Sequence, residues 1–369
     1  MDKSFEIKIE GTTIRLKGNL DGKNASALEG AMRNDAIYMI DFTDVEDINF
    51  AALRALLNLR KSGLHFSVVN ANSEVAEKFE DTGVSAFVPV CRKPKHLDMS
   101  KYIEFGASFL SKAYNSADGD AMIKVYSERT PHEVVMREKA VAKAVMLFGI
   151  PTPLVGTLHQ DGESMGLDFE RIEGKRSFSR IISEEPERLE EMTVRFAKMC
   201  KELHSKPCDT TVFTNKKMIY RPAILACKDI TEEERQKALD FLDNVPNSTT
   251  CLHGDMQLSN VITNGKEDLW IDLSDFSYGC PMFDMGMWYF LSQLNPEHLM
   301  INLFHFGKKE MDQVWPIFVR EYFGTKTEAE QAEVRKQVEP FAALHMLFLG
   351  ATYGFEPGML DFVKAKLLN

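Results

Sequence analysis

The stretch CLHGDMQLSNVI, residues 251–262, places a carboxylate and an amide between apolar flanks. Asp255 and Asn260 are separated by four residues, and the apolar pair Val261 and Ile262 follows directly. Burying either polar side chain without a partner costs free energy. The interval therefore predicts a tight loop that presents both side chains to one centre.

A second acidic segment, LWIDLSDFSYGCPMFDMG, follows at residues 269–286. Residues 269–271 are expected to form a short apolar strand that ends at Asp272. The spacing of Asp255, Asn260 and Asp272 resembles that of the catalytic and metal loops of protein kinases, and this resemblance implies Asn260 and Asp272 as magnesium ligands beside nucleotide phosphates. Magnesium prefers oxygen ligands and keeps several waters, so one carboxylate and one amide suffice. Asp275 is the rival of Asp272 for this role.

Upstream, the sequence AMIKVY at residues 121–126 predicts a strand that carries Lys124 between apolar neighbours. A lysine in this setting needs anionic partners. Its similarity to the V-A-I-K lysine of protein kinases implies a nucleotide phosphate and a helix carboxylate. Glu138 is the candidate carboxylate, within a helix expected over residues 131–149. Glu133 is the alternative, although its place near the helix start favours a surface role.

With these segments in place, residues 102–350 resemble the superfamily of aminoglycoside phosphotransferases and choline kinases. The signatures are HGDMQLSN and IDLSDFSYGCPMFDMG, together with Lys124 and FERIEG at residues 169–174. The resemblance implies a two-lobed protein-kinase-like fold, with a small β-rich lobe over 101–173 and a larger helical lobe over 174–369. It also implies transfer of the γ-phosphate of ATP, or GTP, to the hydroxyl of a small-molecule substrate, with Mg²⁺ as cofactor.

The resemblance assigns roles in the helical lobe residue by residue. Asp255 becomes the catalytic base, and Asn260 and Asp272 become the magnesium ligands. His253 and Asp284 become structural residues that brace the two loops. Each role has a structural alternative, such as a turn-capping Asp255, but the matched spacing of the three polar residues favours chemistry.

In the small lobe, the resemblance assigns the nucleotide contacts. Lys124, paired with Glu138, contacts phosphate, although an ordinary edge-strand lysine is the alternative. The loop that covers the phosphates is expected within residues 104–113, where Ser108 is the candidate in place of a glycine-rich motif. The backbone of the interlobe hinge is expected to meet the adenine. The hinge residues are Phe169, Glu170, Arg171 and Ile172.

Residues 1–92 alternate between strand and helix patterns, which predicts a mixed sheet with packed helices. They resemble the STAS (anti-sigma-factor-antagonist) domain in YMIDFTDVEDINFAALRALLNLRKSG, residues 38–63, and FSVVNANSEVAEKFEDTGV, residues 66–84. The family's Asp-Ser-Ser-Gly loop aligns with residues 49–52, which lack the phosphate-accepting serine. Switching by phosphorylation is therefore not expected, whereas docking to a protein partner or self-association stays open. The basic, proline-containing residues 93–100 are the predicted linker.

Composition excludes several other classes. The chain has 44 basic and 55 acidic residues and a net charge of −11, which argues against nucleic-acid binding. No run of 18 apolar residues predicts a membrane span, and the N-terminus MDKSFEIKIEG has no signal-peptide pattern. The six cysteines lack paired spacing, so neither a zinc site nor a disulfide framework is expected and a cytoplasmic location is predicted.

Two alternative functions remain open at this point. The first is a catalytically idle kinase-fold protein that binds nucleotide and regulates through its STAS-like domain. The second is a protein kinase, which the short interval between Asp272 and Asp284 disfavours because little room is left for an activation loop. The phosphate acceptor stays open as well, since the variable helical lobe builds its pocket.

Overall fold

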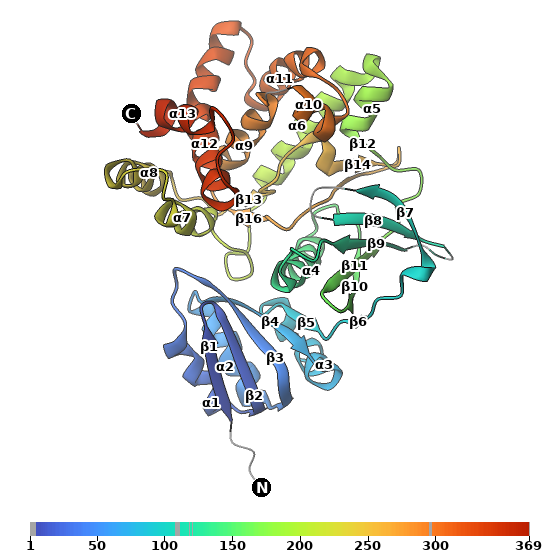
Figure 1. Cartoon of the computed structure of the whole chain (residues 1–369), viewed down its shortest axis with the longest axis vertical. Coiled ribbons are helices and arrows are strands. Elements are labelled where there is room, and N and C mark those ends of the chain that lie inside the picture. The colour runs from blue at the N-terminus through green and yellow to red at the C-terminus, as the bar shows by residue number, and fades with distance from the viewer. Residues whose placement is uncertain (1–4, 108–110, 118, 120, 295–296, 369) are drawn as a thin grey trace. The chain divides into compact units, whose positions relative to one another are not determined.

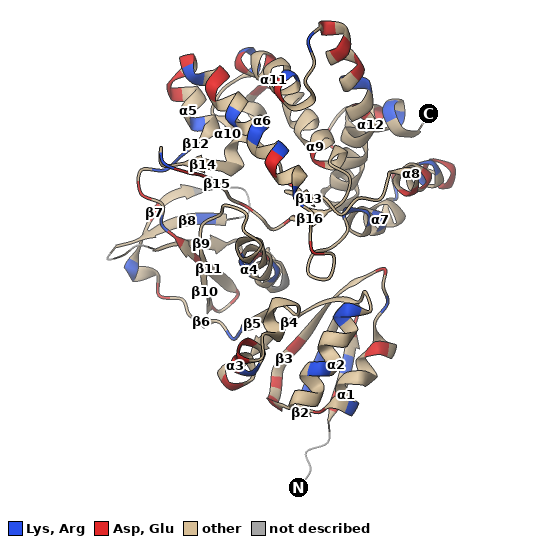
Figure 2. Ribbon diagram, turned by 180° about the vertical axis from the view of Figure 1, so that it is seen from behind, with Lys and Arg blue, Asp and Glu red and all other residues tan. Residues whose placement is uncertain are grey.

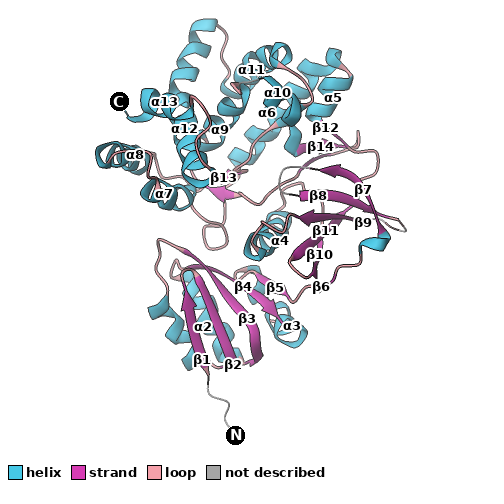
Figure 3. Ribbon diagram, in the orientation of Figure 1, coloured by secondary structure: helices cyan, strands magenta, loops and turns pink. Residues whose placement is uncertain are grey.

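The computed structural model describes residues 5–107, 111–117, 119, 121–294 and 297–368. The chain divides into two compact units, residues 1–173 and 174–369 (Figure 1). The first unit contains a five-stranded and a six-stranded sheet, and the second unit is mainly helical (Figure 3).

The N-terminal sheet has the strand order β1-β2-β3-β4-β5. β1 and β2 are antiparallel, and the remaining neighbours are parallel. Parallel strands need crossover connections, and helices supply them here. The strands are β1 (Glu6–Glu10), β2 (Thr13–Leu20), β3 (Ile37–Ile48), β4 (His65–Ala71) and β5 (Val90–Arg92). The helical segments are α1 (Gly22–Ser26), η1 (Ala27–Ala31), α2 (Phe50–Lys61), α3 (Ser73–Asp81) and η2 (Val84–Ala86).

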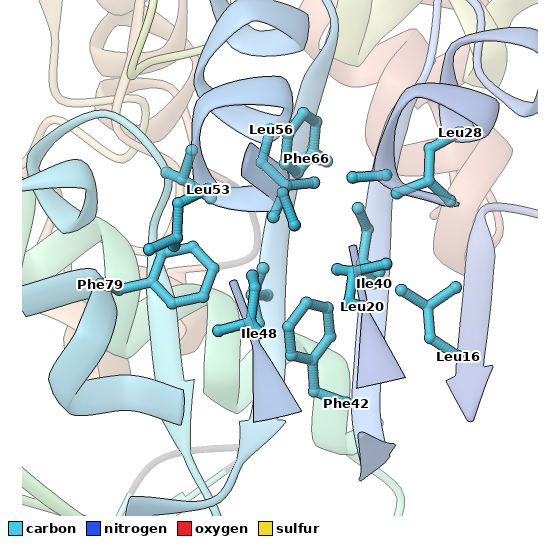
Figure 4. Packing of buried hydrophobic residues seen from close by; sticks show 14 of the residues in the cluster. Leu16, Leu20, Leu28, Ile40, Phe42, Ile48, Leu53, Leu56, Phe66 and Phe79 are labelled. Carbon is cyan, nitrogen blue, oxygen red and sulfur yellow. The ribbon is translucent and has the colours of Figure 1, made fainter. Parts of the chain in front are cut away.

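Alternating apolar residues of the strands pack against the helices to form the core of this sheet (Figure 4). Ile40 and Phe42 of β3 are fully buried, as is Leu56 of α2. Phe79 of α3 meets Phe42 edge to face at a centroid distance of 6.3 Å. Burial of this apolar surface is the main favourable term for the domain.

The six-stranded sheet has the order β6-β10-β11-β9-β8-β7. Its strands are β6 (Lys95–His96), β7 (Tyr102–Ala107), β8 (Ser111–Ser116), β9 (Ala121–Tyr126), β10 (Val155–Asp161) and β11 (Ser164–Glu170). Helix α4 (His132–Leu147) follows β9, and the short η3 (Met99–Lys101) precedes β7. β6 lies inside the predicted linker 93–100 and pairs in parallel with β10, so part of that segment is an edge strand of the sheet.

The second unit is built on helices with two small sheets among them. Its helical elements are α5 (Phe178–Glu184), η4 (Pro186–Arg188), α6 (Leu189–Ser205), α7 (Lys216–Ala226), α8 (Glu232–Asn244), η5 (Leu258–Asn260), α9 (Met282–Ser292), α10 (Glu297–Phe304), α11 (Lys308–Phe323), α12 (Glu328–Tyr353), α13 (Met359–Val363) and η6 (Lys364–Leu368). The strands are β12 (Arg176–Ser177), β13 (Cys251–Leu252), β14 (Val261–Thr263), β15 (Asp268–Trp270) and β16 (Ser277–Tyr278). The sheet orders are β12-β14-β15 and β13-β16.

Helices α9 and α12 approach each other closely at Gly286. A Cβ atom on Gly286 would lie 2.5 Å from the backbone carbon of Phe341, so a larger residue would push the helices apart. This contact matters to the site because α9 also carries Asp284 in its first turn.

Acidic and basic residues alternate along helices such as α8 and α12 (Figure 2). Among the described residues, no helix combines the length and apolar character that crossing a membrane requires.

We predict that the N-terminal domain is acid-sensitive through His65. Burial, with the nearby Arg60 charge, lowers the pKa of His65 to about 4. The unfolded chain then binds a proton more readily, so stability that is present above pH 6.5 is lost as the pH falls toward 4. Replacing His65 by Gln should remove about 2–3 kcal/mol of the pH dependence of the unfolding free energy between pH 7 and pH 4.

Urea unfolding at several pH values in this range measures the difference. The matched control is H96Q, because His96 is exposed. Equal pH dependence of unfolding in wild type and H65Q would contradict the assignment.

Candidate active site

The loop between β13 and β14 holds the carboxylate of Asp255 between two amides. Asn260 donates from Nδ2 to Asp255 Oδ2 at 2.7 Å and to the Asp255 carbonyl at 2.8 Å. Gln257 donates from Nε2 to Asp255 Oδ1 and Oδ2 at 3.1 and 3.0 Å. Both hydrogens of the Asn260 amide therefore point at Asp255, which leaves the amide oxygen to face another ligand.

A β-hairpin brings Asp272 to the same end as Asn260. β14 and β15 are antiparallel, and Val261 stands opposite Trp270. One residue further out, the Ile271 amide donates to the Asn260 carbonyl at 3.0 Å. Asp272 follows with φ +60°, a left-handed conformation that aspartate tolerates better than most residues. The hairpin thus brings Asn260 and Asp272, which are twelve residues apart in the sequence, close together in space.

The carboxylates of the two loops repel one another. Burial, followed by the charges of Asp272 and Asp275, raises the pKa of Asp255 to about 7. The hydrogen bonds from Asn260 and Gln257 oppose this shift. A site of this kind gains stability when a cation neutralises part of the negative charge.

Asp284, at the start of α9, anchors the loop that carries Asp255. Its Oδ2 accepts the His253 amide at 2.7 Å, and its Oδ1 accepts the Gly254 amide at 2.9 Å. His204 Nε2 also lies 3.1 Å from Oδ2. Burial opposes ionisation, but the hydrogen bond and charge of His204 keep the pKa of Asp284 below its ordinary value.

Gly254 is required where it stands. Its φ is +86°, and a Cβ atom there would lie 2.1 Å from the carbonyl oxygen of Asp275. The arginine that protein kinases carry at this position cannot be accommodated in this backbone, so the two loops pack more closely than a side chain would allow.

His253 connects the same two loops through its ring. Its Nδ1 accepts the Asp255 amide at 3.3 Å, and its Nε2 lies 3.1 Å from the Ile271 carbonyl. The ring also packs on Trp270, with centroids 4.8 Å apart. Burial lowers the pKa of His253, which favours the neutral form with the proton on Nε2. His253 therefore has a structural role, because its ring holds the Asp255 loop against the segment around Trp270 and Ile271.

Three further residues at the site were not predicted from the sequence. Gln257 holds Asp255, and His204 of α6 contacts Asp284. Lys216 of α7 is buried, and its Nζ lies 3.5 Å from the Gly254 carbonyl. Of these, only Gln257 lies within the motif CLHGDMQLSNVI. A polar residue between the apolar Met256 and Leu258 could have indicated a role at the site.

The small lobe contains an ion pair between β9 and α4. Lys124 Nζ lies 2.9 Å from Glu138 Oε1, and the Glu138 side chain is only 5% exposed. Lys124 also lies over the ring of Tyr126 at 5.1 Å. The side chain of Glu133, the alternative partner, and all of Ser108 lie outside the described residues.

The hinge residues lie at the end of β11 and just beyond it. Phe169 packs against the apolar cluster beneath α4, and Ile172 is buried. The Glu170 amide donates to the Leu154 carbonyl at 2.8 Å, and its side chain accepts the Leu154 amide at 3.1 Å. Arg171 Nη1 lies 3.5 Å from the Gly119 carbonyl. These contacts fix the backbone of the segment.

The donor set fits a magnesium ion that is shared with a nucleotide. Within the described part of the chain, no group of three or more His, Cys, Asp or Glu side chains could hold a metal alone. The amide oxygen of Asn260 and the carboxylate of Asp272 would supply two hard oxygen ligands. Phosphates and waters would complete an octahedral shell.

Comparison with protein families decides the classification of the chain. The profile of the phosphotransferase enzyme family matches residues 101–337. The chain belongs to this family. The STAS domain profile matches residues 4–96. Both resemblances inferred from the sequence are thereby confirmed, as is the predicted fold class of a mixed STAS sheet followed by a kinase-like phosphotransferase fold.

Solved structures similar to the chain include phosphotransferases. A choline/ethanolamine kinase family protein from Mesorhizobium loti is 14% identical, with 72% of this chain and 85% of that chain covered and a TM-score of 0.44. An aminoglycoside-3'-phosphotransferase of type VIII is 19% identical, with coverages of 67% and 94% and a TM-score of 0.45. The amicoumacin kinase in complex with AMP-PNP and Ca²⁺ is 10% identical, with coverages of 79% and 91% and a TM-score of 0.46. No curated protein matches the chain.

We predict that Asp284 is a main contributor to the stability of the helical lobe. Replacing it by Ala leaves the His253 and Gly254 amides buried without an acceptor, which should lower the free energy of unfolding by about 3 kcal/mol. Urea unfolding measures the change, with D229A as control because Asp229 is exposed. A loss below about 1 kcal/mol would show that the loop holds its shape without this carboxylate.

Proposed function

We propose that this phosphotransferase is a small-molecule kinase that transfers the γ-phosphate of ATP, or GTP, to a substrate hydroxyl with Mg²⁺. The observation that carries the proposal is the pair of loops at the hairpin end. Two amides, from Asn260 and Gln257, orient the Asp255 carboxylate there, and Asp272 is near enough for its charge to raise the pKa of Asp255. Membership of the phosphotransferase family supports the reaction class.

In the proposed mechanism, Asp255 accepts the proton of the attacking hydroxyl. The bonds from Asn260 and Gln257 hold its oxygens in one orientation, so positioning is arranged before the substrate arrives. Asn260 and Asp272 would hold Mg²⁺, which would neutralise charge on the transferred phosphoryl group. Lys124, aligned by Glu138, would contact the nucleotide phosphates, and the backbone of residues 169–172 would meet the base.

The experiment that tests the function is an ATP-consumption screen against a library of alcohol-bearing metabolites. The D255N variant keeps the shape of the side chain but cannot accept a proton. We expect its turnover on any substrate found to fall at least about a hundredfold, the scale of general-base catalysis. Its affinity for Mg-ATP should stay close to that of the wild type.

The outcomes separate the competing functions. Unchanged turnover of D255N would contradict the base assignment, and D229N serves as the surface control. Nucleotide binding without turnover across the library would favour the idle regulatory protein. Label from ATP that appears on protein rather than on small molecules would favour a protein kinase.

We predict that Asp272 is responsible for magnesium-dependent nucleotide binding. Replacement by Asn preserves a residue that tolerates φ +60° but removes the negative charge. The affinity for ATP in the presence of Mg²⁺ should fall about tenfold or more, as expected for one lost charged contact. Without metal, D272N should be at least as stable as the wild type, because a charge that repels Asp255 has been removed.

Calorimetric titration of ATP with and without MgCl₂ measures the first effect, and thermal unfolding measures the second. D275N is the matched comparison because Asp275 is the rival ligand. Loss of the magnesium effect in D275N, with D272N unaffected, would transfer the metal role to Asp275.

A further inference from the structure

The STAS sheet and α4 share an apolar cluster, which we call the STAS–α4 seam. Val69 of β4 and Cys91 of β5 contribute from the STAS domain, and both are essentially inaccessible to solvent. α4 contributes Val135, Met136 and Ala140. The remaining buried members come from the six-stranded sheet and are Tyr126, Leu158, Met165 and Leu167. β4 and β5 lie beside α4 in Figure 1.

Strand β4 is apolar on both faces, and the two faces serve different partners. Val68 belongs to the core of the STAS domain itself, whereas its neighbour Val69 belongs to the seam. Adjacent residues of a strand point to opposite faces. The second face of β4 is therefore occupied by a helix of the kinase domain rather than left free for another protein.

Two hydrogen-bonded connections also attach the STAS domain to the kinase-like domain. The thiol of Cys91 donates to the carbonyl of Met136 in α4 at a distance of 3.2 Å. Burial raises the pKa of the Cys91 thiol to about 11, so the sulfur keeps its proton and remains a donor. Beyond β5, the chain enters β6 and pairs with β10, and the Leu97 amide donates to the Gln160 carbonyl at 3.0 Å. The STAS domain is thus attached to both α4 and the small-lobe sheet.

The same helix carries Glu138 toward Lys124. Met136 and Ala140 are four residues apart and share one helix face. Glu138 lies between them in sequence, about 200° around the helix axis from each. It shares the side of α4 that holds Val135 and pairs there with Lys124 of β9. The pair with Lys124 spans 2.9 Å, a distance that a small shift of the helix would break. α4 therefore links the STAS domain at one face to the ion pair at the other.

The seam is incompletely packed beside Val69 and Met136. A cavity of about 490 Å³ borders Val69 and Met136, and Arg15, Asp41 and Lys93 also line it. Most of the residues that line this space are polar, so the apolar contacts of Val69 and Met136 at its edge contribute much to holding α4 in place on this side. Removing methyl groups from Val69 would enlarge an existing space toward which the helix can move.

We propose that the STAS domain acts as a positioning element for α4, and that Val69 holds Glu138 on Lys124. In protein kinases, the corresponding ion pair must be in place for catalysis. The proposal rests on the proposed function for its effect on nucleotide. It assigns to the STAS domain a role within its own chain that does not need a phosphorylation switch.

The test compares V69A with V68A in the full chain. Both variants remove the same atoms from buried valines of one strand, and both should lower the melting temperature. Hydrogen exchange measured without nucleotide should show faster exchange across α4 in V69A than in V68A. The affinity for AMP-PNP with Mg²⁺ should fall about fivefold or more in V69A, within the usual range of coupling between sites, and less than twofold in V68A.

A conservative variant, V69I, keeps the seam filled and should retain the wild-type affinity. Equal α4 exchange in V69A and V68A would overturn the proposal, as would equal nucleotide affinities in two folded variants. If the wild-type chain binds no nucleotide, the proposed function fails, and the exchange comparison still decides whether Val69 positions α4. The two failures are thereby distinguishable.

Discussion

The arrangement of the helical lobe depends on one buried carboxylate. Asp284 accepts the amides of His253 and Gly254 and contacts His204, so three elements meet on its two oxygens. A buried carboxylate is stable only when hydrogen-bond donors surround it. Those donors come from the loop that carries Asp255, and satisfying Asp284 therefore fixes that loop. Gly254 completes the constraint, because only a residue without a side chain fits against the Asp275 carbonyl.

The site built on this anchor is electrostatically unfavourable without a cation. Asp255, Asp272 and Asp275 lie close enough that the charges of the latter two raise the pKa of Asp255. A protein selected for stability alone would separate or neutralise these groups. The hydrogen bonds from the amides of Gln257 and Asn260 offset part of the repulsion. The remaining repulsion is what a divalent cation and its bound phosphates would relieve.

The STAS domain and the small lobe both contact helix α4. One face of α4 packs on Val69 and Cys91, and Glu138 leaves the other face to pair with Lys124. In many kinase folds the position of the corresponding helix is where regulation acts. In this chain, the STAS domain packs against that helix. The STAS domain lacks the acceptor serine, which is consistent with a role that does not require phosphorylation.

The sequence by itself determined which polar residues are candidates for the site and how they are spaced along the chain. The spacing of Asp255, Asn260 and Asp272 resembles that of the catalytic and metal loops of kinases, from which two neighbouring loops were predicted. In the structure the β14–β15 hairpin brings Asn260 and Asp272 to one end. Alternating strand and helix patterns predicted the mixed sheet of the N-terminal domain, and a strand-rich stretch followed by helices predicted the second domain. Local periodicity was sufficient for these elements, because each strand or helix shows its own hydrophobic pattern.

Only the tertiary structure decided the contacts made between distant segments. His204 and Lys216 stand on helices that carry no motif, and nothing local marks them as neighbours of the Gly254 loop. The sequence indicated a linker at residues 93–100 because a basic stretch with proline is typical of one, yet β6 forms there by pairing with β10. A strand pair or a buried ion contact is stabilised by its partner, and the partner's position is set by the packing of the whole domain rather than by the local sequence.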